Sequence, residues 1–334
     1  MIINEESQIP LFGLDFIGIL DRGTNLIEVK PLTTCNLKCK YCFVCSGDYD
    51  NNFTLESDYI IKWLKKALLI KAVDDAEIHI APYGEFFQYK DYEKLIKEIR
   101  SLPQVKTISI QTNGTLIRDD MIKKLESSGV TRLNISFNSL DPALAKLLSG
   151  NPNYNVKKML QLFDKILKSK MDLLIAPIWF FGKNDGEIIK IIELAKEYEK
   201  MGYNDNDKFR LGIQNYLVYK TGRKLSRVKE REFKYFYRML GKLEKKYDIK
   251  LKLGPLDFDI HRSRSIEPPA SIGEIKRVQI LSEGRNPGEY IGGLNHLWAV
   301  KVLSKFSLDI GSNVNVEIIK RRRNENLLTG RLIY

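Results

Sequence analysis

The strongest constraint on the fold is an alternation of short apolar runs with amphipathic helical patterns, which begins near residue 24. Six runs have the composition of strands, namely 25–31, 76–82, 106–113, 132–138, 171–180 and 209–216. Several are apolar at both odd and even positions, as expected of strands buried on both faces of a parallel sheet. The pattern predicts an α/β fold, either a parallel barrel or a doubly wound sheet.

Helical patterns fill the intervals between these runs. The stretch 55–71 repeats its apolar positions at helical spacing. Two residues have the character of helix starts, Thr54 and Asp141, and Asp141 is followed by Pro142. In folds of this kind the reacting groups lie at the C-terminal ends of the strands.

The periodic pattern stops at the segment 253–271, which contains three prolines and is expected to be irregular. After it, four short apolar runs separated by Gly and Asn turns predict a small all-β barrel. The predicted organisation is an N-terminal extension, an α/β domain, a linker and a β-barrel, with the bounds 1–23, 24–255, 256–271 and 272–334.

All four cysteines of the chain lie between positions 35 and 45, in the stretch TTCNLKCKYCFVC. The N-terminus MIINEESQIP lacks the basic and apolar regions of a signal peptide, and no apolar run is long enough to span a membrane. We therefore expect a cytoplasmic protein whose thiols stay reduced, and clustered thiols in that compartment indicate a metal site.

Three metal sites compete for these thiols. Structural zinc sites usually join two Cys pairs across a linker, and the chain has no second pair. The spacing of Cys39, Cys42 and Cys45 matches part of the bacterial ferredoxin pattern, but the fourth cysteine followed by proline is missing. The remaining pattern is Cys35-x₃-Cys39-x₂-Cys42, directly after the first predicted strand, and it suits three ligands of a [4Fe–4S] cluster.

This spacing, with the aromatic Tyr41 before the last ligand, resembles the signature loop of the radical SAM superfamily. The resemblance implies a partial (β/α)6 barrel with a [4Fe–4S] cluster held by Cys35, Cys39 and Cys42. It further implies that S-adenosylmethionine (SAM) binds the fourth iron. An electron from the cluster would cleave SAM to methionine and a 5′-deoxyadenosyl radical, which takes a hydrogen atom from the substrate. An electron donor such as a ferredoxin or flavodoxin is then required.

Polar residues at other strand ends match secondary motifs of the same superfamily. Gly84 and Glu85 occupy the place of its Gly-Gly-Glu motif, with Tyr83 instead of the first glycine. The resemblance implies that these residues, together with Tyr41, bind SAM, and that further contacts come from the ends of three later strands: Thr112, Asn113, Ser136, Asn138, Gln214 and Asn215. Taken singly, each such residue is equally suited to a helix cap or a loop hydrogen bond.

Cys45 is left over from the cluster pattern. A small buried residue is the simpler interpretation, and a catalytic thiol is the alternative. His79 is expected to be packed within its strand, and neither His261 nor His296 has a ligand-like neighbour in the sequence.

The positive charge of the chain is concentrated in one segment. The net charge is 54 − 42 = +12, and the segment 220–252 holds 13 Lys or Arg against 4 Asp or Glu. We call it the basic segment. Positive charge concentrated in one segment favours a polyanionic partner more than evenly spread charge does.

The C-terminal residues 272–334 resemble a TRAM domain, a small OB-like β-barrel that binds RNA in several RNA-modifying enzymes. The resemblance rests on the strand rhythm and on DIGSNVNVEII and LLTGRL, with Gly311 and Gly330 at turns. The run KRRR at 320–323 could contact phosphate or could protect an edge strand from pairing.

These features together predict a radical SAM enzyme that modifies RNA, with tRNA as the expected substrate and no membrane partner. The chain has no cysteines for a second cluster, so the resemblance disfavours sulfur insertion, and the single spare cysteine disfavours cysteine-dependent methyl transfer. The organisation resembles a group of archaeal-type predicted Fe–S oxidoreductases. A small metabolite or a peptide is the alternative substrate, and a non-catalytic Fe–S RNA-binding protein is a third possibility.

Overall fold

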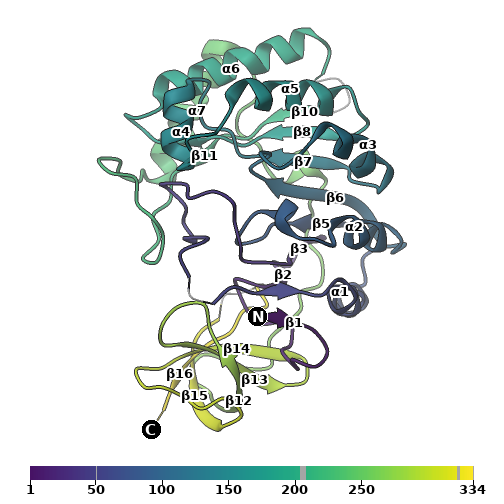
Figure 1. The fold of residues 1–334 in the computed structure, drawn as a ribbon, viewed down its shortest axis with the longest axis vertical. Coiled ribbons are helices and arrows are strands. Elements are labelled where there is room, and N and C mark those ends of the chain that lie inside the picture. The colour runs from purple at the N-terminus through teal and green to yellow at the C-terminus, as the bar shows by residue number, and fades with distance from the viewer. Residues whose placement is uncertain (50, 204–207, 322–323, 334) are drawn as a thin grey trace. The chain divides into compact units, whose positions relative to one another are not determined.

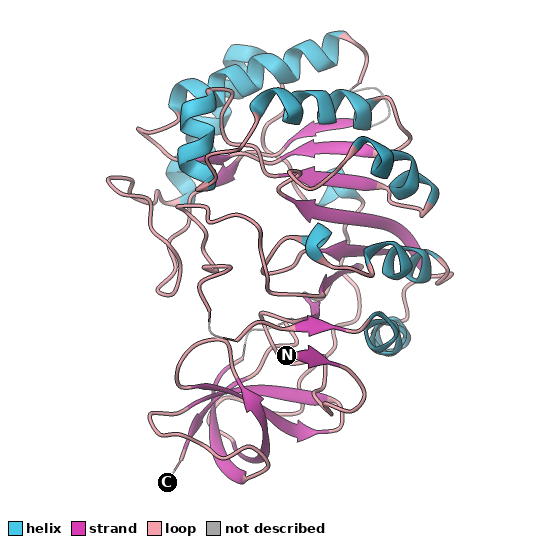
Figure 2. Cartoon of the chain, in the orientation of Figure 1, coloured by secondary structure: helices cyan, strands magenta, loops and turns pink. Residues whose placement is uncertain are grey.

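The computed structural model describes residues 1–49, 51–203, 208–321 and 324–333 (Figures 1 and 2). It divides into two compact units. The barrel unit comprises Met1–Thr34, Asp48–Ile108 and Ile260–Tyr334, and the cysteine unit comprises Cys35–Gly47 and Ser109–Asp259. The domain bounds expected from the sequence stay predictions.

The α/β part of the barrel unit contains strands β2 (Gly18–Asp21), β3 (Leu26–Lys30) and β5 (Ala76–Ile80). Strand β3 pairs with β2 in antiparallel and with β5 in parallel orientation. Ile27 and Val29 of β3 are fully buried, as expected of a strand that contributes to the core. Helices α1 (Ser57–Lys71) and α2 (Tyr92–Arg100) and the short helix η1 (Phe86–Gln88) complete this part.

The predicted β-barrel is present at the C-terminus (Figure 1). Five strands close in the order β12-β13-β14-β16-β15, with the bounds Ile275–Glu283, Glu289–Asn295, Trp298–Leu303, Thr329–Leu332 and Asn313–Lys320. The turn between β13 and β14 is held by Asn295, whose Oδ1 accepts hydrogen bonds from the backbone N–H groups of Leu297 and Trp298 at 2.9 and 3.0 Å. Arg322 and Arg323 of the KRRR run lie outside the described residues.

Residues 1–23, expected only as an extension, contribute to the core of the barrel unit. Strand β1 (Ile2–Ile3) pairs with β4 (Thr54–Leu55). The Phe12 ring contacts both Trp63 of α1 and Trp298 of β14, with centroid distances of 5.1 and 5.7 Å. The N-terminal residues therefore pack between the first helix and the C-terminal barrel.

The cysteine unit contains a parallel sheet formed by the end of β6 (Val105–Thr112) with β7 (Arg132–Ile135), β8 (Asp172–Ile175) and β10 (Phe209–Leu211). The last two predicted strands are each interrupted. Strand β9 (Ile178–Trp179) follows β8 after Ala176–Pro177, and β11 (Gln214–Asn215) follows β10 and pairs with β9. Pro177 lacks a backbone N–H, so the ladder cannot continue regularly through it.

In the described part of this unit, five helices accompany these strands (Figure 2), with the bounds α3 Asp119–Ser127, α4 Pro142–Ser149, α5 Val156–Leu167, α6 Asp185–Lys200 and α7 Phe233–Tyr247. A short helix η3 (Pro255–Phe258) follows α7. The cap predicted at Asp141 is confirmed, because its Oδ1 accepts a hydrogen bond from Leu144 N at 2.6 Å. The start predicted at Thr54 is wrong, because Thr54 pairs in β4 and α1 begins at Ser57.

The α/β fold with a parallel sheet and a closed five-stranded barrel is thus present. The finer assignments, a partial (β/α)6 barrel and a TRAM-type module, stay predictions. Across the described residues, no helix is both long and apolar enough to cross a membrane.

Candidate functional site

The cysteine loop, residues 35–47, is built from consecutive tight turns. The backbone N–H of Cys42 donates to the carbonyl of Cys39 at 3.2 Å, and that of Cys45 donates to the carbonyl of Cys42 at 3.3 Å. All four cysteines lie in the described part of the chain, are half-buried and form no disulfide. The turns therefore keep the thiols of Cys35, Cys39 and Cys42 close enough to interact.

The thiols influence one another's ionisation. Burial raises the pKa of Cys39, and the neighbouring thiols of Cys42 and Cys35 raise it further, to about 12. Three thiolates at one place repel one another unless a cation neutralises them, and thiolates are the usual ligands of iron–sulfur clusters. Within the described residues, no three His, Cys, Asp or Glu side chains are placed to bind one metal ion together. A cluster does not require such an arrangement, because each cysteine binds a different iron.

Arg223 fastens the cysteine loop to the basic segment. Its Nε donates to the Cys39 carbonyl at 2.8 Å, its Nη2 donates to the Ser46 carbonyl at 3.1 Å, and its backbone N–H donates to the Cys42 carbonyl at 2.8 Å. Its positive charge also acts to lower the pKa of Cys39, against the effect of burial. One side chain therefore both holds the loop and supplies positive charge beside the thiols.

The end of helix α4 supports the other side of the loop. The carbonyl of Leu148 accepts a hydrogen bond from the backbone N–H of Lys40 at 2.9 Å. Gly150 ends this helix with a φ of 64°, and a Cβ there would lie 2.1 Å from the carbonyl oxygen of Lys38. Only glycine suits this position, since it needs both a left-handed backbone and close approach to the loop.

Asn113, at the end of β6, connects the sheet to the loop. Its Nδ2 donates to Oδ1 of Asn36 at 2.9 Å, and Asn36 follows Cys35 directly. The Nδ2 of Asn36 donates to Thr115 Oγ1 at 2.9 Å, and Thr115 Oγ1 donates to Asn113 Oδ1 at 2.6 Å. The neighbouring Thr112 is buried, and its Oγ1 accepts from Gly114 N. In this structure Thr112 and Asn113, which were predicted to bind SAM, form hydrogen bonds to nearby residues of the chain.

Asn138 connects the end of β7 to Tyr41. Its Nδ2 donates to the Tyr41 hydroxyl oxygen at 2.6 Å, and its Oδ1 accepts from Ile178 N at 2.7 Å. The Tyr41 ring packs against Phe180 with a centroid distance of 4.8 Å. Tyr41 therefore anchors the cysteine loop in the core of the unit. Ser136 lies two residues before Asn138, and its Oγ accepts a hydrogen bond from Gln111 Nε2 at 3.1 Å.

Asn215 presents a buried acceptor at the end of β11. Its Nδ2 donates to the carbonyl of Arg231 at 2.7 Å, while its Oδ1 is buried and has no hydrogen-bond donor among the described residues. A buried acceptor without a donor is unfavourable, so a ligand N–H or a water at this position would stabilise the site. The adjacent Gln214 is exposed.

Gly84 and Glu85 lie in the barrel unit, beside the residues that precede the cysteine loop in the sequence. The backbone N–H of Glu85 donates to the carbonyl of Thr34 at 2.8 Å, and a Cβ on Gly84 would lie 1.9 Å from the same oxygen. The Glu85 side chain is buried, and its Oε1 accepts from Phe87 N at 3.2 Å. Glycine is thus required for this strand-end turn to approach Thr34.

Cys45 has a left-handed backbone with a φ of 52° and closes the loop after Cys42. An L-residue rarely adopts this conformation, so the position is backbone-strained. His261, with no predicted metal role, hydrogen-bonds through Nε2 to Asp75 at 2.8 Å.

The sequence analysis missed several residues that hold the loop: Asn36, Thr115, Gly150 and Arg223. Asn36 could have been noticed as a polar residue beside the first ligand. Arg223 could not be distinguished from the other cations of the basic segment, because its role depends on a contact between positions far apart in the chain.

Comparison with known proteins agrees with the cysteine pattern. Residues 29–195 match the family model described as the radical SAM superfamily. The chain is 33% identical over 352 residues to an uncharacterized protein of Methanocaldococcus jannaschii, covering 99% of this chain and 80% of that protein. It is 29% identical over 181 residues to the GTP 3′,8-cyclase of Syntrophomonas wolfei, covering 53% of each. The chain thus spans about half the length of that cyclase.

Among solved structures, the fold resembles that of SuiB from Streptococcus suis bound to S-adenosylmethionine. The TM-score is 0.52 at 20% identity, covering 73% of this chain and 49% of that chain. This likeness concerns the fold alone. Because the family model covers half of the chain, including the cysteine loop, the protein belongs to the radical SAM superfamily and is a radical SAM enzyme.

Proposed function

We propose that this enzyme binds a [4Fe–4S] cluster through Cys35, Cys39 and Cys42 and uses SAM to modify RNA, with tRNA as the expected substrate. The observation that carries the proposal is the attachment of the basic segment to the cysteine loop through Arg223. A polyanion bound by that segment would be held beside the cluster ligands.

The residues present fit the cofactors. When bound, the cluster and SAM supply a carbon radical that removes a hydrogen atom from the substrate. The three thiols suit the cluster, and Asn36, Asn138 and Arg223 hold their loop in place. We further propose that Gly84 and Glu85 bind the amino group of SAM. The buried Oδ1 of Asn215 would accept a hydrogen bond from its adenine.

Exposed aromatic residues support a substrate with stacked bases. Phe43 lies between Cys42 and Val44, is 48% exposed, and contacts Tyr219, which is 46% exposed, at a centroid distance of 5.5 Å. At the start of α7, Phe233 and Tyr237 are 52% and 46% exposed and stack at 6.2 Å. Aromatic rings among Lys and Arg residues are the usual platforms for unpaired bases.

The C-terminal barrel provides a second surface for RNA in this proposal, as a TRAM-like module would. Its five-stranded closed architecture is compatible with that role. The proposal also requires a one-electron donor, for which a ferredoxin or flavodoxin is suitable.

The test is reconstitution of the cluster without oxygen, followed by reduction in the presence of SAM and bulk tRNA. We expect 5′-deoxyadenosine to form and a tRNA nucleoside to change in mass. Binding of tRNA should weaken steeply as salt is raised, because Lys and Arg contacts to phosphate release counterions. Absence of tRNA binding at low salt would remove the RNA substrate from consideration.

A nucleoside triphosphate is the second candidate substrate. It is favoured by the similarity to GTP 3′,8-cyclases, which covers about half of the chain. The same assay with GTP in place of tRNA distinguishes the two. A GTP-derived product, with no mass change in tRNA nucleosides, would favour the second candidate.

A further inference from the structure

A groove of about 720 Å³ lies within the barrel unit, between helix α1 and the outer face of the C-terminal barrel. The N-terminal residues Glu5 and Gln8 form one wall, Lys62 and Lys66 of α1 contribute a second, and barrel residues including Arg277 form the floor. This volume is in the range of pockets that bind a nucleotide-sized ligand.

The groove has an excess of positive charge. Lys62 pairs with Glu5 at 2.5 Å, so these two charges neutralise one another. Neither Lys66 nor Arg277 forms an ion pair with any described residue, although the ammonium of Lys66 lies 4.3 Å from the centroid of the Trp63 ring. Two cations without a carboxylate partner can bind phosphate without first breaking an existing pair.

Carboxamides lie across the floor beside these cations. In the strand register, Gln279 of β12 is flanked by Asn313 of β15 on one side and by Gly293 of β13 on the other. Arg277 precedes Gln279 by two residues and therefore shares its face of the sheet. Carboxamides both donate and accept hydrogen bonds, as ribose hydroxyls and phosphate oxygens require.

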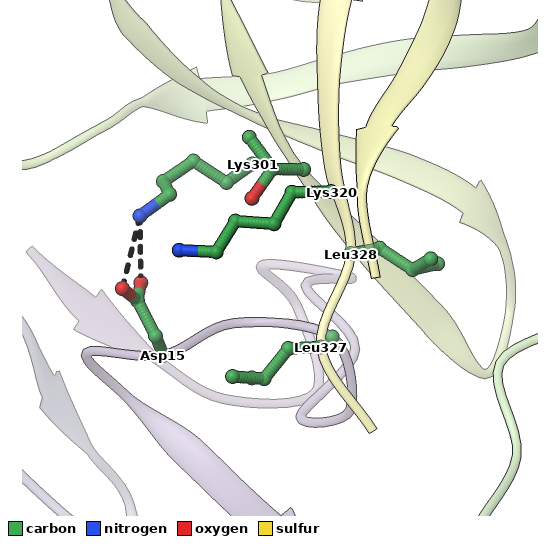
Figure 3. Close-up of a pocket in the computed structure, with 7 residues that line it drawn as sticks. Asp15, Lys301, Lys320, Leu327 and Leu328 are labelled. Atoms are coloured by element: carbon green, nitrogen blue, oxygen red, sulfur yellow. Dashed lines mark hydrogen bonds and ion pairs between the residues drawn. The ribbon is translucent and has the colours of Figure 1, made fainter. Parts of the chain in front are cut away.

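A smaller cavity in the barrel unit provides a contrast (Figure 3). It measures about 30 Å³ and is lined by Lys320 and by an ion pair, with Lys301 Nζ 3.0 Å from each carboxylate oxygen of Asp15. Such a space holds a water molecule or two and no larger ligand. Its ion pair connects the N-terminal segment to β14, so this cavity is structural.

We propose that the groove between α1 and the barrel binds the ribose–phosphate backbone of the RNA substrate. The inference rests on the proposed RNA function and locates the RNA-binding surface of the barrel unit in this groove. The buried rings of Tyr59 and Trp63 are 7% and 2% exposed, so recognition here depends on phosphate and hydrogen bonds, not on stacking.

The test compares two double variants in tRNA binding, measured by fluorescence anisotropy at several salt concentrations. The groove variant is Lys66→Glu with Arg277→Glu. The matched control is Lys65→Glu with Lys305→Glu, which changes the same charge in α1 and in the barrel at exposed positions outside the groove. We expect the groove variant to bind about 10-fold more weakly or worse, and its salt slope to fall by about 1 to 2.

Formation of 5′-deoxyadenosine without RNA should be equal in wild type and both variants, since none of these residues belongs to the cysteine loop. If a charge reversal disturbs folding, Lys66→Gln and Arg277→Gln provide milder replacements. Equal binding by the groove and control variants would overturn this inference and leave the RNA function standing. A wild-type protein that binds no tRNA at low salt would overturn both.

Discussion

The Nε of Arg223 donates a hydrogen bond to the backbone carbonyl of Cys39, with a distance of 2.8 Å between the two atoms. Its Nη2 also donates to the Ser46 carbonyl, and its backbone N–H donates to the Cys42 carbonyl. Replacement of the side chain keeps the backbone bond but leaves the carbonyls of Cys39 and Ser46 without these donors. Hydrogen bonds from a charged group to a carbonyl each contribute about 1.5–3 kcal/mol. Arg223 therefore determines how well the loop is organised for a cluster.

We expect Arg223→Gln to retain less iron and sulfide per chain after reconstitution. The reduction potential of the remaining cluster should shift to a more negative value, because a nearby positive charge favours the reduced form. Arg223→Lys should bring the reduction potential closer to its wild-type value than it brings the iron content. Lys224→Gln, an adjacent exposed cation, serves as the control. Equal iron content and equal potential in Arg223→Gln and Lys224→Gln would contradict this role.

Replacement of Cys45 should affect the cluster differently from replacement of the three predicted ligands. Replacement of Cys35, Cys39 or Cys42 by Ala should abolish cluster incorporation, measured as iron and sulfide content. Cys45→Ala should keep the cluster, the yield of 5′-deoxyadenosine and the substrate turnover, because the position is interpreted as structural. Retained cluster and deoxyadenosine with lost turnover would instead identify the Cys45 thiol as a reacting group.

Much of the fold could be predicted from local patterns. Each of the six apolar runs contains a strand, and the cap at Asp141 follows from a local signal in the sequence. The sequence does not predict the interruptions at Ala176–Pro177 and after Leu211. They depend on the pairing of two neighbouring strands, which are interrupted at matching positions. Thr54 does not begin a helix, because its backbone pairs with Ile2 in a two-stranded sheet.

In the candidate site, too, local features could be predicted from the sequence and long-range contacts could not. The thiols form a recognisable spacing, whereas the residues that hold them act from distant positions. Arg223 and Gly150 reach the loop from more than one hundred positions away in the sequence, as the numbering itself shows. Contacts of this kind depend on tertiary packing and leave no periodic or local signal.

Gly84→Ala should destabilise the strand-end turn, because the new Cβ would lie 1.9 Å from the Thr34 carbonyl oxygen. We expect a lower unfolding temperature and weaker SAM binding, measured by differential scanning calorimetry and titration calorimetry. Gly186→Ala in α6 is the matched control, since no atom lies within 4 Å of its added Cβ. The unfolding temperature of this control should change little, because the added methyl group meets no other atom. Equal behaviour of the two variants would refute the role assigned to Gly84.

The buried ion pair of Lys71 with Asp21 should be a strong determinant of stability in the barrel unit. Both side chains are fully buried, their charged atoms lie 2.5 Å apart, and Asp21 also accepts a hydrogen bond from Ile266 N at 2.7 Å. Lys71→Met should lower the free energy of unfolding by about 3–5 kcal/mol, because it leaves a buried carboxylate unpaired. Adding Asp21→Asn should recover part of this loss.

Chemical denaturation checks this prediction, with Lys94→Met as the control. Lys94 pairs with Asp58 at 2.7 Å, but the two side chains are 49% and 78% exposed. Water and salt screen an exposed pair of this kind, so its loss should change the free energy of unfolding little. A loss in Lys71→Met no larger than that in Lys94→Met would show that the buried pair is dispensable.

Stability of the barrel unit should depend on pH through His261. A hydrogen bond with Asp75, and next one with the carbonyl of Arg262, raise the pKa of His261 above its ordinary value of 6.5. A raised pKa in the folded state stabilises the protein fully below the unfolded value, and this contribution is lost as pH rises through the folded pKa. Wild type should therefore exceed His261→Gln in unfolding free energy at about pH 5.5, and the difference should vanish by about pH 8.5. Asp75→Asn should produce the same pH dependence, and the double variant should add little to either single change. A wild-type advantage that stays constant over this pH range would mean that the pair acts through packing and not through the imidazolium charge.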